Sequence, residues 1–110
     1  MAGTYALTKN TDGRFLFNLT AENGEKILTS QSYEAKLGAQ DGIESVRSTA
    51  AVAAQFDRMT SKDEKPYFVL KSRNGEVIGT SQQYSSRSAM ENGIESVMEN
   101  APAATVDDNT

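Results

Sequence analysis

The side chains best suited to chemistry in this chain are carboxylates that occur twice at a fixed separation. Glu44 and Glu95 lie 51 positions apart, each in a segment predicted to be helical. Two carboxylates that converge in a cleft can form a glycosidase pair or a metal site. On a helix, however, each glutamate lies about 100° from the neighbouring isoleucine, away from the centre of the apolar stripe. We therefore interpret both as solvated or boundary carboxylates that bond to the other half of the molecule.

Repeated serines and tyrosines are the other candidates for chemistry. A serine nucleophile needs an activating base, and the chain contains no His, no Cys and no Ser-x-x-Lys pattern. We interpret the serines as capping residues or as strand-to-helix hydrogen-bonding groups; they are Ser30, Ser45, Ser81 and Ser96. Tyr33 and Tyr84 are predicted to pack at strand–helix junctions, with a paired aromatic ligand cradle as the alternative. No catalytic residue, cofactor site or metal site is predicted.

Composition narrows the class of protein further. The 110 residues carry a net charge of −4, which argues against a binder driven by phosphate contacts. The first residues lack the basic and apolar regions of a signal peptide, and no window of the sequence could span a membrane. The sequence therefore predicts a cytoplasmic protein that is not associated with a membrane.

The elements that position these side chains come from an internal duplication. With an offset of 51 residues and no gap, residues 15–50 and 66–101 are identical at 16 of 36 positions. Each copy alone would be near the lower limit for folding without a disulfide or a metal. The two copies are therefore predicted to share one core as a single domain over residues 1–110, as a monomer with pseudo-dimeric repeats.

The first copy, about residues 5–50, predicts three strands and a helix. The strands fall at residues 5–9, 14–20 and 25–30, with Asn23-Gly24 as a type I′ hairpin turn. Apolar residues at spacings of four, four, three and four then predict a helix from about residue 34 to residue 50. Residues 51–55 link this copy to the next.

The second copy, about residues 56–101, repeats this plan. Strands are predicted at 56–60, 66–71 and 77–81, followed by a helix at about 85–100 that Ser85 or Ser86 could cap. The charged loop 62–65 has no glycine and is predicted to differ in geometry from the Asp-Gly turn of the first copy. Residues 102–110 are polar, acidic and poor in apolar side chains, and predict a disordered tail.

The two β-β-β-α repeats predict an α+β fold. Their strands should form one six-stranded antiparallel sheet with both helices on one face and a pseudo-two-fold axis between the copies. The twice-repeated Asn-Gly-Glu, Thr-Ser, Tyr and Gly-Ile-Glu-Ser-Val segments resemble the YegP-like family of small bacterial tandem-repeat domains of unknown function. That resemblance spans about residues 5–101, and it implies that each helix is exchanged onto the other half. It brings no substrate, cofactor or catalytic residue.

A set of repeated residues is interpreted as structural. Gly42 and Gly93 lie inside helices, where a glycine costs roughly 1 kcal/mol relative to alanine. We predict that they permit close packing where a Cβ would clash, with close approach to a ligand as the alternative. The complete structural repeat motif is Asn23, Gly24, Gly42, Glu44, Asn74, Gly75, Gly93 and Glu95.

The sheet face opposite the helices is the predicted contact surface. Strand alternation places on it a mixture of aromatic, aliphatic and cationic side chains, which is unusual for a purely solvated face. These are Lys26, Leu28, Tyr67, Val69, Lys71 and Val77. The alternative is a half-solvated face with a few scattered apolar groups.

Two functions follow from that surface. The favoured one is a non-enzymatic module that binds a protein partner. The second is weak binding of single-stranded nucleic acid, with a base stacked on Tyr67 and phosphates near Lys26, Lys71 and Arg73. The negative net charge and the small number of cations favour the protein partner.

Overall fold

A computed structural model describes residues 3–110 as seven strands, two α-helices and one short 3-10 helix. In chain order the elements are β1 (Thr4–Lys9), β2 (Phe15–Thr20), β3 (Lys26–Thr29), α1 (Lys36–Thr49), η1 (Ala53–Gln55), β4 (Phe56–Thr60), β5 (Pro66–Lys71), β6 (Val77–Thr80), α2 (Arg87–Asn100) and β7 (Thr105–Asp108). The β-β-β-α plan of both repeats is confirmed, with each predicted strand and helix ending within two residues of its expected position. Ser86 is the N-cap of α2, and its side chain accepts a hydrogen bond from the Ala89 N–H.

The sheet has seven strands in the order β4-β5-β6-β3-β2-β1-β7. The prediction of six antiparallel strands is therefore wrong, because β7 joins the sheet parallel to β1. The prediction of a disordered tail is wrong for the same segment. The segment has too few apolar side chains to be recognised as a strand from its sequence. It is ordered because the otherwise unpaired edge of β1 provides its backbone hydrogen-bond partners. The Thr105 and Asn109 N–H groups donate to the Gly3 and Leu7 carbonyls at 3.2 and 2.8 Å.

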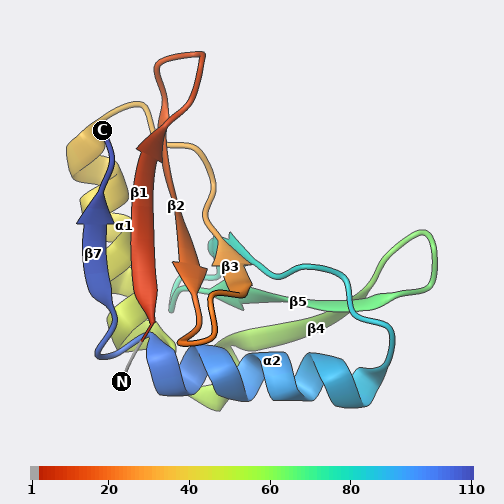
Figure 1. The fold of residues 1–110 in the computed structure, drawn as a ribbon. Helices are drawn as coiled ribbons and strands as arrows, with labels where there is room; N and C mark the ends of the chain where they lie inside the picture. The colour runs from red at the N-terminus through yellow and green to blue at the C-terminus, as the bar shows by residue number, and fades with distance from the viewer. Residues whose placement is uncertain (1–2) are drawn as a thin grey trace.

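The two halves of the sheet meet at one narrow junction. β3 and β6 are joined through a single register pair, Thr29 with Thr80. Figure 1 shows β1 and β2 crossing β4 and β5 at a steep angle, so the sheet forms two wings. Each helix packs on the middle strand of its own repeat and also on strands of the other, α1 on β2, β5 and β6, and α2 on β5 and β3. A complete exchange of helices is therefore not what the fold shows, because each helix spans the junction.

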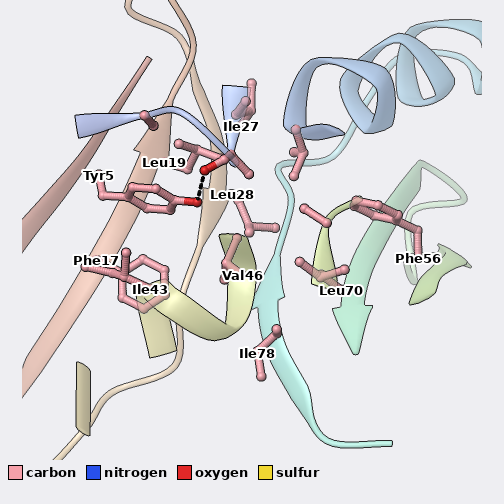
Figure 2. Close-up of a cluster of buried hydrophobic side chains, with 14 of the residues drawn as sticks. Tyr5, Phe17, Leu19, Ile27, Leu28, Ile43, Val46, Phe56, Leu70 and Ile78 are labelled. Atoms are coloured by element: carbon pink, nitrogen blue, oxygen red, sulfur yellow. Dashed lines mark hydrogen bonds between the residues drawn. The ribbon is translucent and has the colours of Figure 1, made fainter. Parts of the chain in front are cut away.

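Buried side chains from both repeats form one core cluster. Figure 2 shows Tyr5, Phe17 and Val46 of the first repeat in the same cluster as Phe56 and Leu70 of the second. The Tyr5 hydroxyl donates to the carbonyl of Ala101, beyond the end of α2, at 2.8 Å. Burial raises the pKa of the Tyr5 phenol well above its usual range, so the hydroxyl that forms this hydrogen bond between the repeats stays protonated.

The hairpins share one turn geometry that differs from the predicted type I′ turn. Gly24 has a φ of 86° and donates its N–H to the Ala21 carbonyl, which closes a turn with a single left-handed residue. Gly13 adopts the same conformation, and Glu64, its counterpart 51 positions later, does so with a φ of 62°. The glycine-free loop of the second repeat therefore keeps the geometry of the first, and the prediction that it differs is wrong.

A β-bulge occurs at the same place in both repeats. Leu19 opposes Leu28 while Thr20 opposes Lys26, so Ile27 is an extra residue in β3, and Ile78 is its counterpart in β6. The bulge reverses the alternation of side chains along the strand. As a result, Ile27 and Leu28 are both buried in the core.

Candidate functional site: the open face of the second repeat

The repeated serines in the strand-to-helix segments are structural. Ser30 Oγ accepts a hydrogen bond from the Phe17 N–H at 2.9 Å and donates to the Gln31 carbonyl at 2.7 Å. Ser81 Oγ makes the same two contacts, with the Phe68 N–H and the Gln82 carbonyl, at the same distances. Each serine ends the pairing of its third strand with the middle strand and holds the chain as it leaves the sheet.

The helix glycines make room for the repeated tyrosines. A Cβ at Gly42 would lie 2.9 Å from Tyr33 Cζ, and one at Gly93 would lie 2.6 Å from Tyr84 Cζ. Each tyrosine also stacks on the middle-strand phenylalanine of its repeat, with ring centroids 6.3 Å apart for Tyr33 and 6.2 Å for Tyr84. The ring and its hydroxyl occupy the space that a helical side chain would need, which explains why glycine and tyrosine recur together.

The Tyr84 hydroxyl is a buried polar group with no hydrogen-bond partner among the described residues. Burial raises the pKa of its phenol. A hollow of about 360 Å³ lies beside it, between the β2–β3 turn and α2, and Glu25 and Asn92 contribute to its lining. Across the same junction, Gln82 Nε2 donates to Glu25 Oε1 at 2.7 Å.

The repeated glutamates lie on the solvent side of the helices. Glu44 pairs with Arg47 at 3.1 Å through a side chain that is 71% exposed, and Glu95 is also exposed. An exposed carboxylate lacks the desolvation that would tune it for acid–base catalysis. In residues 3–110, no group of three or more His, Cys, Asp or Glu side chains is arranged to hold a metal ion.

One residue assigned to the predicted contact surface, Leu28, does not lie on it. Leu28 is only 2% exposed and lies in the core beneath the helices, so its placement on the open face is wrong. The bulge at Ile27 is the reason, because simple alternation through β3 assumes one residue per pleat. Leu28 instead fills the space above Gly79, where an added Cβ would lie 2.7 Å from its side chain.

The other predicted members lie on the open face, mostly in the second repeat. Tyr67 is half-buried, Val69 is only 7% exposed among its neighbours, and Val77 is 39% exposed. Val77 opposes Lys71 across the β5–β6 pair, which places both on this face. Lys26 is exposed on β3.

One residue of this face was missed by the sequence analysis. Met59 in β4 opposes Tyr67 in β5, and its side chain is 42% exposed. Alternation along residues 56–60 would have found it, because Phe56 is buried and Met59 has the opposite parity. We call Met59, Tyr67, Val69 and Val77 the apolar face of the second repeat.

A hollow of about 450 Å³ lies next to this apolar face. It is bordered by the β4–β5 loop on one side and by the chain that follows β6 on the other. The lining residues are Ser61, Lys62, Asp63, Tyr67, Thr80, Ser81 and Gln83. An aromatic wall with polar groups around it suits the insertion of one apolar side chain of a partner.

The cations near this face are partly neutralised. Lys71 Nζ lies 2.7 Å from Asp57 Oδ2. Lys26 and Arg73 are exposed, on β3 and on the β5–β6 turn. A lysine already paired with a carboxylate is a weaker partner for phosphate, so the predicted Lys/Tyr patch carries less free positive charge than its residue count indicates.

Comparison with known proteins places the chain. A family model described as a domain of unknown function (DUF1508) matches it twice, over residues 10–57 and 61–108. The chain belongs to this family. The DUF1508 chain is 49% identical to a UPF0339 protein of Shewanella oneidensis and 44% identical to the UPF0339 protein YegP of Escherichia coli K12, over the whole of each chain. The resemblance to the YegP-like family is thereby confirmed.

Two solved structures share the fold of this DUF1508 chain. The solution NMR structure of the Shewanella oneidensis UPF0339 protein superposes with a TM-score of 0.92, covering 98% of this chain and 92% of that one. The solution NMR structure of the E. coli protein of unknown function YegP gives 0.95, covering 100% and 95%. Within the described residues, no helix is long and apolar enough to cross a bilayer. The function of the family is unknown.

Proposed function

We propose that this DUF1508 chain is a non-enzymatic module that binds a protein partner through the apolar face of the second repeat. The observation that carries the proposal is the apolar pair of Met59, which is 42% exposed, and the half-buried Tyr67. The two residues oppose each other, and Tyr67 lines a hollow of about 450 Å³. Aromatic and methionine side chains are enriched at the buried centres of protein interfaces. The chain acts as a monomer in this proposal, with two repeats that form one scaffold.

The same positions in the first repeat provide an internal control. The counterparts of Met59, Tyr67 and Val69 are Thr8, Leu16 and Asn18, and Asn18 is occupied by a hydrogen bond from Thr29 Oγ1 at 2.8 Å. This wing of the open face is more polar and has fewer large side chains. A partner that depends on aromatic anchors should therefore distinguish the two wings.

The test is capture from a native lysate with the full chain as bait, followed by titration with the purified partner. Tyr67→Glu should abolish capture, whereas the matched variant Leu16→Glu should not. With purified components, Tyr67→Ala should weaken binding by about 2 kcal/mol or more if it is an anchor, with little dependence on salt. Equal loss in the Tyr67 and Leu16 variants would contradict the proposal.

Nucleic-acid binding is the competing outcome of the same experiment. Fluorescent single-stranded DNA and RNA should show no micromolar binding at about 50 mM salt, where electrostatic binding is strong. Micromolar binding that disappears in the double variant Lys26→Glu/Lys71→Glu would replace the proposed function with the nucleic-acid alternative.

A further inference from the structure

The two outer edges of the sheet are unequal, although the repeats that form them are related. β1 and β4 are counterparts, each pairing with the middle strand of its own repeat. β7 covers the outer side of β1, whereas within residues 3–110 no strand pairs with the outer side of β4. Figure 1 shows β7 lying against β1. It shows β4 at the opposite end of the sheet.

Backbone groups of β4 point toward this free edge. Phe68 uses its N–H and its carbonyl on the β6 side, since both bond to Ser81 at 2.9 Å. Arg58 opposes Phe68, so its own N–H and carbonyl point away from β5. Leu7 is the counterpart of Arg58 in β1, and its carbonyl accepts the Asn109 N–H that holds the end of β7.

A cationic side chain at the start of a helix lies near each outer edge of the sheet. Lys36, the first residue of α1, lies 2.6 Å from Asp108 of β7, and Asp108 opposes Leu7. The counterpart of Lys36 is Arg87, the first residue of α2, which is exposed. Arg58 adds a second guanidinium, held by Glu91 at 2.5 and 2.8 Å. Glu91 and Glu64, which also lies beside these arginines, offset their charge, so a carboxylate would be attracted here by the two guanidinium groups and not by a net positive charge.

Space is available at this position. A hollow of about 360 Å³ lies between the outer edge of β4 and the start of α2. Arg58 and Arg87 contribute to its lining, and so do Ser85, Ser86, Met59 and the carboxylate of Glu64. In the other half, the counterpart of Arg87 is Lys36, which pairs with Asp108, and the counterpart of Arg58 is Leu7, whose carbonyl accepts the Asn109 N–H.

We propose that the outer edge of β4 binds an extended peptide segment of a partner protein, parallel to β4, with a carboxylate of the peptide placed between Arg58 and Arg87. Addition of a strand to an exposed edge supplies backbone hydrogen bonds, and side-chain contacts supply specificity. The site is the edge and the helix side of β4. It shares Met59 with the apolar face of the second repeat but does not include Tyr67, Val69 or Val77.

The register of β7 also predicts the residue before the carboxylate. Asp107 opposes Ala6 in β1, and the counterpart of Ala6 is Asp57. An acidic residue there would lie beside the Asp57 carboxylate and be repelled by it, whereas a lysine would be attracted to that carboxylate in competition with Lys71, which pairs with it at 2.7 Å. The β7 strand of a second copy therefore fits this edge less well than a segment with a basic or neutral residue followed by an acidic one.

The test is an NMR titration of the ¹⁵N-labelled full chain with a capped peptide that copies residues 104–110 and carries D107K. Saturable shift changes are expected at the amides of residues 56–60 and 87–91, with a dissociation constant on the order of 1 mM or tighter. A peptide that also carries D108N should bind about fivefold more weakly, the upper end for an exposed ion pair. A spin label at the peptide N-terminus should broaden Phe56 more than Thr60.

Protein variants check the electrostatic assignment. Arg87→Glu should weaken binding at least as much as D108N in the peptide, whereas Lys26→Glu, the same charge change on β3, should leave the affinity unchanged. Glu91→Gln should tighten binding, because it releases Arg58 and places at this site the residue type of Gln40, its counterpart. The Tyr67→Glu variant should still show the shift changes on addition of the peptide. Peptide binding at β4 can therefore be distinguished from the proposed function, which Tyr67→Glu should abolish.

Four outcomes would overturn the proposal. They are no shift change at residues 56–60, equal affinity for the two peptides, an antiparallel pattern of broadening, and shift changes confined to β1 and β7. The last would mean that the peptide displaces β7. Concentration-dependent dimerisation of the wild-type chain through β4 and β7 would replace the partner segment with a second copy.

Discussion

The two repeats are alike where they form the shared scaffold and different where they face outward. Both have the same bulge, the same serine contacts to the middle strand and the same tyrosine packed over a helix glycine. They differ on the open face and at the outer edge. The first repeat has a more polar face and an edge covered by β7. The second has an apolar face and an edge that no strand of the described residues covers. The duplicated residues account for the shared fold, and the residues that do not repeat account for the two surfaces of the second half on which the binding proposals rest.

The pseudo-two-fold axis shows why the copies could not stay identical in the interior either. Leu28 and Gly79 are counterparts in β3 and β6, and the leucine occupies the space over the glycine. Two leucines would compete for one volume in a close-packed interior. A single-chain tandem repeat can place a large residue on one side and a small one on the other, which two identical chains related by symmetry cannot do.

The largest effect is expected from exchanging these two residues. Leu28→Gly should cost at least about 2–5 kcal/mol through the cavity that it leaves. Gly79→Leu should cost about 1–3 kcal/mol through overpacking. The double variant should be more stable than either single variant, because the leucine then fills the same space from the other side. Urea unfolding measures all three, and a double variant that loses the sum of the two costs would show that the positions are not exchangeable.

Substitution of the helix glycines should give the next largest effect. Alanine gains about 1 kcal/mol in helix propensity over glycine. The clash with the tyrosine should outweigh that gain, for a net loss of about 1–3 kcal/mol by overpacking. Gly93→Ala should lose more than Gly42→Ala, because its Cβ would lie closer to the tyrosine ring, at 2.6 rather than 2.9 Å.

Thermal unfolding of both glycine variants checks this order. In a Tyr84→Ala background, the penalty of Gly93→Ala should disappear, since the clashing ring is absent. A higher melting temperature in both single variants would remove the packing explanation.

A smaller effect of opposite sign is expected in the β4–β5 turn. Glu64 has a φ of 62°, in the left-handed region that costs an ordinary residue about 1 kcal/mol or somewhat more. Glu64→Gly should therefore stabilise the second repeat by up to about 1 kcal/mol, and Gly13→Ala, at the counterpart, should destabilise the first by a similar amount. Equal and opposite shifts in unfolding midpoint would confirm that the two turns are equivalent. No gain in Glu64→Gly would mean that the glutamate side chain compensates for its backbone.

The attachment of β7 should respond to acid. The Lys36 ammonium and the hydrogen bonds of Thr110 lower the pKa of the Asp108 carboxyl to about 2. Because the folded pKa lies below the usual 3.8, the contact is fully formed above about pH 4 and is lost as the pH falls toward 2. The effect should be small, since Asp108 is exposed.

A carboxyl NMR titration measures this pKa directly. Lys36→Gln should raise the pKa of Asp108 toward its usual value and shift the amides of β7 at a higher pH than in the wild type. An Asp108 pKa near 4 in the wild type would show that the ion pair does not hold β7 in solution.

Most of the architecture was readable in the sequence because it rests on local patterns. Asn-Gly and Asp-Gly punctuation, strand alternation and helical spacing located the elements of both repeats, and the exact recurrence of motifs showed that they form one pseudo-symmetric domain. The structural interpretation of Ser30, Ser81, Gly42 and Gly93 also came from type and spacing. These features depend on residues close together in the chain.

The tertiary structure decided what depends on residues far apart. The bulge that buries Leu28 is a register shift between paired strands, and no alternation within one strand reveals it. β7 has almost no apolar signature of its own, and becomes a strand because the bare edge of β1 supplies its backbone partners. The free edge of β4, with Arg58 and Arg87 beside it, follows from the strand order, because β7 pairs with β1 and no strand within residues 3–110 pairs with the outer side of β4.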